Sequence, residues 1–130
     1  MVVVAAALVS SAAGAAEPPA VPTALVSGTV HQALFSIAMD GKTGYAAGAA
    51  GEILQTGDGG VSWQAMTPAP TPPSLLGVTT NGGRTLAVGQ KGLILSLKNG
   101  KWTSVDSASK SRLFAVDVNH KGDAVAVEGA

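Results

Sequence analysis

From residue 33 to the last residue, apolar and polar positions alternate in short segments. Such alternation over four to eight residues is typical of half-buried β-strands, because successive side chains of a strand point to opposite faces. Clusters of Gly, Asn and Asp separate the segments and favour tight turns. No stretch has the sustained 3.6-residue period of a long helix. The pattern therefore predicts an all-β chain of short antiparallel strands.

These segments recur with a period of about forty residues. The run LFSI at 34–37 returns as LLGV at 75–78 and as LFAV at 113–116, at spacings of 41 and 38 positions. Gly48 and Gly51 recur as Gly89 and Gly92 at the same offset of 41. A period of this size, made of short strands and turns, is the signature of a β-propeller blade.

The repeat predicts a partial β-propeller of about two and a half four-stranded antiparallel blades. We assign residues 33–130 to it, as a blade at 33–66, a blade at 75–105 and a half blade at 113–130. The predicted strands cover 34–39, 44–48, 52–56, 61–66, 75–80, 84–89, 93–97, 101–105, 113–118 and 125–130. Trp63 and Trp102 are expected at equivalent buried positions. A ring closes only at roughly four to eight blades, so an open strand edge and apolar faces should stay available for pairing with another chain.

The first 32 residues have a different character. Val2 to Val9 form an apolar run of the length of a signal-peptide core, and small residues follow up to Ala16. We predict a signal peptide at 1–16, cleaved before Glu17, and a proline-rich linker at 17–32. The run is too short for the roughly 20 residues that span a bilayer as a helix. We therefore expect the chain to be exported.

Composition narrows the function classes. Eight basic and eight acidic residues give a formal net charge of zero, and only 12% of the residues are charged. No basic run suggests nucleic-acid binding. The absence of cysteine excludes thiol catalysis, disulfides and cysteine-based zinc sites.

One specific motif lies in the first repeat. The run TGDGGVSW at 56–63 fills every defined position of the Asp-box pattern, with Thr56, Asp58, Gly60, Ser62 and Trp63. We expect a hairpin in which Asp58 accepts backbone N–H bonds, Gly60 takes a positive φ and Trp63 is a buried anchor. The motif is interpreted as structural. In the second repeat, residues 99–100 (Asn-Gly) replace it with a two-residue turn.

The wider pattern resembles a known family. The runs GYAAG at 44–48 and GEILQT at 51–56, the Asp-box, and then LAVG at 86–89 and GLIL at 92–95 look like the photosystem II stability/assembly factor family of Asp-box (BNR-repeat) propellers, of which this chain would be a fragment. The resemblance implies an exported propeller without catalysis that holds a membrane-protein subunit during complex assembly. It implies the periplasm, or the thylakoid lumen in a phototroph.

Two other functions stay open. Asp-boxes also occur in sialidases, which need three arginines and a tyrosine nucleophile beside a carboxylate. This chain has only Arg84, Arg112 and Tyr45, so a glycosidase fragment is disfavoured and Tyr45 is expected to be a packing residue. His31 and His120 lie at no metal-ligand spacing. We expect no catalytic, cofactor-binding or metal site; the second alternative is a structural or oligomer-forming repeat module.

The remaining candidate site is a binding surface made of loops, where the function of such scaffolds usually resides. The turns between the first and second strands of successive blades recur at equivalent positions, so they should share one face. The expected partner is a protein, namely a membrane-complex subunit, and not a nucleic acid. The candidate binding residues in these turns are Asp40, Lys42, Asn81, Arg84, His120 and Lys121.

Overall fold

The computed structural model describes residues 3–4, 26–27, 33–66 and 73–129 of the chain. Most of the predicted signal peptide and linker, and most of the proline-rich loop at 67–74, lie outside the described residues. Two short segments of the N-terminal region are described, β1 (Val3–Val4) and β2 (Val26–Ser27), and they pair antiparallel. The cleavage site and the boundary at residue 17 therefore stay predictions.

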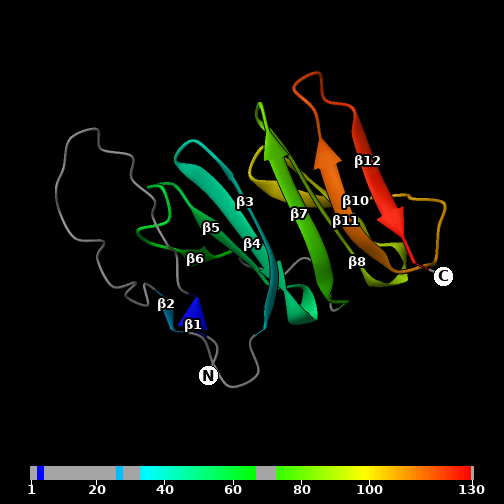
Figure 1. Cartoon of the computed structure of the whole chain (residues 1–130), viewed down its shortest axis with the longest axis horizontal. Coiled ribbons are helices and arrows are strands. Elements are labelled where there is room, and N and C mark those ends of the chain that lie inside the picture. The colour runs from blue at the N-terminus through cyan, green and yellow to red at the C-terminus, as the bar shows by residue number, and fades with distance from the viewer. Residues whose placement is uncertain (1–2, 5–25, 28–32, 67–72, 130) are drawn as a thin grey trace, which may run out of the picture.

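The rest of the described chain forms three antiparallel sheets that stand side by side like blades (Figure 1). The first sheet contains β3 (Leu34–Asp40), β4 (Thr43–Gly48), β5 (Ile53–Thr56) and β6 (Gln64–Ala65). The second contains β7 (Leu75–Asn81), β8 (Arg84–Gly89), β9 (Ile94–Lys98) and β10 (Lys101–Val105). The third contains β11 (Leu113–Val118) and β12 (Ala124–Glu128). Strands neighbour one another in chain order in every sheet, which is the meander of a propeller blade and confirms the predicted fold class.

The strand predicted at 61–66 is wrong in length. Only Gln64 and Ala65 pair with β5, because residues 57–62 form a wide turn around Asp58 before the chain reaches the sheet.

The first strand of each of the three sheets contains a β-bulge, which the sequence did not predict. The register shifts immediately after Leu34, Leu75 and Leu113, at the same place in each repeat.

Short 3₁₀ turns join the second and third strands of the first two sheets, at Ala49–Gly51 and Gln90–Gly92. Their central residues have φ of 55° and 59°. The glycine before each turn meets the chain that enters the blade: a Cβ at Gly48 would lie 1.9 Å from Ala33 O, and one at Gly89 would lie 2.1 Å from Ser74 O. This close approach explains why both repeats have glycine there.

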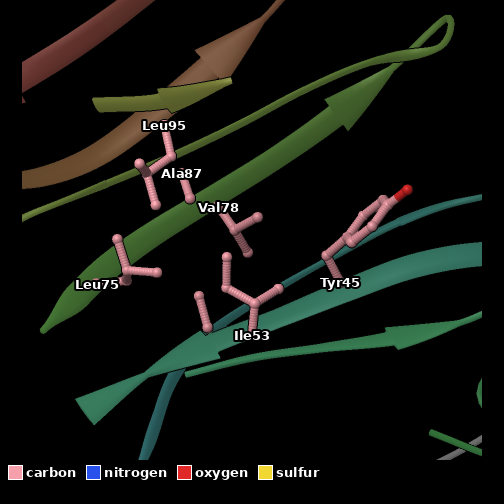
Figure 2. Close-up of a cluster of buried hydrophobic side chains, with 7 residues drawn as sticks. Tyr45, Ile53, Leu75, Val78, Ala87 and Leu95 are labelled. Carbon is pink, nitrogen blue, oxygen red and sulfur yellow. The ribbon is translucent and has the colours of Figure 1, made fainter. Parts of the chain in front are cut away.

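The first two sheets pack face to face through one apolar cluster (Figure 2). The first sheet contributes Tyr45, Ala47 and Ile53, and the second contributes Leu75, Val78, Ala87 and Leu95. All seven are at most 6% exposed. The Tyr45 ring also meets Trp102 edge to face, with centroids 5.9 Å apart. Full burial of one large aliphatic side chain contributes roughly 1.5–3 kcal/mol, so this cluster contributes strongly to the stability of the fold.

The opposite face of the second sheet packs on the third sheet. Leu86 and Val88 flank Ala87 in β8 and therefore point away from the first cluster. Both are buried, as are Leu113 and Val118 of β11, and β11 lies against β7 and β8. A Cβ at Gly77 would lie 3.1 Å from Ala115 Cα, so this interface is tight.

The two tryptophans are less buried than expected. Trp102 pairs with Leu97 across β9 and β10, and the register of β5 and β6 places Trp63 at the equivalent position of the first sheet. Both side chains are half-buried. Trp102 lies in β10 and Trp63 lies next to β6, and these two strands are the edge strands of their sheets. Trp63 Nε1 donates to Gly60 O at 3.1 Å, whereas Trp102 Nε1 faces Met66 Sδ at 3.0 Å.

Truncation inside the first interface should be far more damaging than the same truncation outside it. Ile53 is 0% exposed and Ile37 is 53% exposed. We expect Ile53→Ala to lower the free energy of unfolding by about 2–5 kcal/mol, through lost transfer energy and an unfilled cavity. The matched Ile37→Ala should cost less than about 1 kcal/mol. Urea unfolding at low protein concentration measures both, and equal losses would contradict the assigned core.

Candidate functional site

Three hairpin turns from three different sheets lie next to one another along one edge of the structure, and we call them the turn rim. They are the turns at 40–43, 81–84 and 119–123, at the top of Figure 1. The Gly82 N–H donates to Asp40 Oδ2 at 2.9 Å. Asn81 Nδ2 donates to the Val118 carbonyl at 3.1 Å. Each turn is thus bonded to the next one.

The six candidate binding residues all lie on this rim, but they divide into two kinds. Asp40 and Asn81 make the bonds between turns and are therefore structural in the free protein. Lys42, Arg84, His120 and Lys121 are exposed. The Arg84 guanidinium reaches over the third turn, where Nη1 lies 3.4 Å from the Cβ position of Gly122. The rim consequently presents cationic and imidazole groups on a hydrogen-bonded base.

The turn from Thr56 to Trp63, called the Asp58 turn below, has a dense set of hydrogen bonds. Thr56 Oγ1 donates to Asp58 Oδ1 at 2.8 Å and accepts the Gly60 N–H at 2.9 Å. Asp58 Oδ1 accepts the Ser62 N–H at 2.9 Å, and Oδ2 accepts the Ser62 hydroxyl at 2.5 Å. Gly60 has φ of 93°. Both carboxylate oxygens are used within the turn, as expected for a structural motif.

The hydroxyl and the backbone N–H of Ser62, with the Thr56 hydroxyl, lower the pKa of Asp58 to about 2. These donors bind only the charged form well, so they favour ionisation although the carboxylate is exposed. Asp58 is therefore anionic at any physiological pH.

The Asp58 turn lies next to the turn rim, a neighbour that we did not predict from the sequence. The Gly59 N–H donates to the Lys42 carbonyl at 2.8 Å. The order of the strands could have predicted this position, because in a meander the turns after the first and third strands emerge at the same end of the sheet. The equivalent turn of the second sheet is a tight one, with φ of 51° at Asn99 and 76° at Gly100, as the Asn-Gly pair predicts.

Two shallow depressions on the described part of the chain are large enough to hold a small molecule. One, of about 350 Å³, is lined by Gln55, Gly57, Asp58, Ser62 and Gln64. The other, of about 530 Å³, lies beside the Gln90–Gly92 turn and has Lys91 and Asp106 as its charged groups. Asp106 Oδ1 accepts the Ala108 N–H at 2.9 Å. Neither depression gathers the paired acid, base or nucleophile that a hydrolytic site needs.

Tyr45 lies in neither depression. It is 5% exposed and packed between the first two sheets, which agrees with its expected packing role. In the part of the chain that the structure describes, no group of three metal-ligating side chains occurs. No helix within the same residues is long and apolar enough to cross a membrane.

A scan against protein-family models gives no match, and a search of curated proteins gives none. Among solved structures, the chain is similar to one described as "YCF48 bound to D1 peptide", with a TM-score of 0.65 and 19% sequence identity. The similarity covers 73% of this chain and 33% of that one. The fold is a partial β-propeller. The chain spans about a third of the length of the protein it resembles.

The pH dependence of stability should reveal the Asp58 turn. The pKa of Asp58 is about 2 in the folded chain, against an ordinary value of 3.8 for a solvated Asp. Its stabilising effect is therefore present above pH 3.8 and is lost as the pH falls through 2. Urea midpoints of the wild type and Asp58→Asn should differ most near neutral pH and converge toward pH 2.

The exposed Asp106 provides the control, since Asp106→Asn removes a carboxylate and leaves the Asp58 turn intact. A direct reading comes from the carboxyl carbon of Asp58, which should titrate near pH 2 by NMR. A midpoint close to 4 would contradict the hydrogen bonds described here.

Proposed function

We propose that this chain is part of a non-catalytic, exported β-propeller scaffold that binds a protein partner, a subunit of a membrane complex, during assembly or regulation of that complex. The observation that carries the proposal is the turn rim. Its exposed side chains stand on turns that are hydrogen-bonded to one another, so a partner meets a surface that is already ordered, and little conformational entropy is lost on binding.

The structural neighbour supports the same class of function. Its description states that YCF48 is bound to a D1 peptide, so a propeller of this fold does bind a polypeptide. The family resemblance carried by the repeats and by the Asp-box points the same way. We extend peptide or protein binding to this chain as a proposal, in which the exposed Lys42, Arg84, His120 and Lys121 contact the partner.

The non-catalytic part of the proposal is supported by the state of the one tyrosine. A glycosidase of the Asp-box type needs an accessible tyrosine nucleophile, and Tyr45 is covered by the second sheet. We expect fluorogenic sialosides to stay intact when they are incubated with the chain. Hydrolysis that disappears in Tyr45→Phe would overturn this part.

Export is supported by the apolar run and the small residues that follow it. We expect secretion through a bacterial inner membrane, with Glu17 as the new N-terminus, measured by mass spectrometry of the periplasmic fraction. A chain that keeps its first 16 residues and stays in the cytoplasm would contradict the localisation.

The binding surface can be tested by site-specific crosslinking in the source cells. A photoreactive amino acid at Lys42 or His120 should crosslink to a membrane protein. The same group at Lys91, in the turn at the opposite end of the second sheet, should not do so. Crosslinking from Lys91 alone would contradict the proposal, because it would show that the partner binds at the end of the blades opposite the turn rim.

Charge reversal then separates a specific rim from general surface charge. Lys42→Glu with Arg84→Glu should abolish the crosslink from His120. Lys91→Glu with Lys110→Glu changes the net charge equally at exposed positions and should preserve it. Equal loss in both double variants would show that net charge, and not the turn rim, determines binding.

A further inference from the structure

The two terminal sheets each have exposed apolar side chains on a face that no other described sheet covers. On β3, Phe35, Ile37 and Met39 are 53%, 53% and 42% exposed. On the third sheet, Val125 and Val127 of β12 are 65% and 54% exposed. We call these the β3 face and the β12 face. Ribbons of the two strands stand at opposite ends of the row of sheets (Figure 1).

The repeat shows what each face matches. Ile37 pairs with Ala46, and Ala46 with Leu54; Val78, Ala87 and Leu95 are the same positions in the second sheet. In the second sheet this set receives the first sheet. The β3 face therefore has the composition of a receiving face. Ala46 and Leu54 are already buried, so β3 is the part that remains accessible.

The β12 face is of the opposite kind. Val125 pairs with Asp117 and Val127 with Ala115, just as Tyr45 pairs with Ala38 and Ala47 with Ser36. Tyr45 and Ala47 belong to the face of the first sheet that docks on β7. The β12 face is thus an inserting face, and β7 shows that one receiving strand contacts both the first and the second strand of the sheet before it.

We propose that the β12 face of one copy of this chain packs on the β3 face of a second copy, in the manner of the contact between the first two sheets. The contact is head to tail, because the two faces differ, and such contacts build rings or open arrays. A second copy is the occupant that the structure favours, since the chain contains both faces and already joins faces of these two kinds internally. The net charge of zero also means that copies do not repel one another at long range.

Asp117 supplies a sharp test. It lies on the β12 face, at the position that Thr79 occupies in the second sheet, where that threonine is 7% exposed against the third sheet. Head-to-tail packing would desolvate the Asp117 carboxylate, which is unfavourable without a partner charge. Asp117→Thr should therefore tighten association by about tenfold or more. Asp106→Thr removes the same charge beside the Gln90–Gly92 turn, away from both faces, and should leave association unchanged.

The direction of the contact can be tested by mixing two blocked variants of the full chain in sedimentation velocity. Ile37→Asp blocks the β3 face and Val125→Asp blocks the β12 face, both at exposed positions that the fold tolerates. Each variant alone should be monomeric. An equimolar mixture should form a one-to-one dimer, because each variant keeps the face that the other lacks. The control Val61→Asp changes an exposed apolar residue of the Asp58 turn and should associate like the wild type.

Each other result overturns the proposal. A monomeric wild type at micromolar concentration would assign the faces to a different occupant. Association of either blocked variant with itself would indicate that identical faces meet. A mixture that stays monomeric would show that the two faces do not bind each other. Circular dichroism spectra identical to that of the wild type establish that the variants are folded.

Discussion

The packing of sheet on sheet is the interaction on which this structure depends. A meander of four short strands has two faces and cannot cover either of them alone, so each sheet is stable only against a neighbour. The second sheet is covered on both faces, by Tyr45, Ala47 and Ile53 on one side and by β11 on the other. Its burial explains why most of the large, fully buried side chains lie in or against it.

Small residues decide how closely these sheets approach. Ala47 and Ala87 are fully buried at the first contact, and at the second contact a Cβ at Gly77 would lie only 3.1 Å from Ala115 Cα. At the strand ends, Gly48 and Gly89 touch the carbonyl of the segment that enters each blade. A fixed distance between sheets then fixes the distance between their turns. The Asp40 carboxylate can therefore reach the Gly82 N–H of the next sheet.

The polar chemistry of the chain serves this architecture more than it serves reactivity. Asp58 uses both carboxylate oxygens inside its own turn, and Ser36 accepts the Val78 N–H at 3.1 Å, between two sheets. Ser107 donates to the Gly92 carbonyl at 2.6 Å, between the second sheet and the loop that follows it. The groups left over for a partner are exposed side chains on turns. This division suits a binding scaffold, in which rigid strands hold variable loops.

The sequence by itself determined the local structure and the repeat. Alternation placed the strands, Asn-Gly and Asp-box patterns placed the turns, and the spacing of 41 residues showed which positions are equivalent, because these features depend on neighbours within a few residues. The equivalence also predicted that the candidate turns share one end of the blades. It did not predict the bulges after Leu34, Leu75 and Leu113, or how short β6 is, since both depend on the strand alongside.

Only the tertiary structure decided which equivalent residues are buried. Ile37 and Val78 occupy the same position of the repeat, yet the first is 53% exposed and the second 6%. The difference arises because Val78 has the first sheet packed against it, whereas Ile37 has no sheet against it among the described residues. In the same way, Asp40 and Asn81 form hydrogen bonds between turns, while Lys42 and Arg84 extend into solvent. The local sequence does not determine this difference, because the packing of the sheets sets which side chains lie within hydrogen-bonding distance of the next blade.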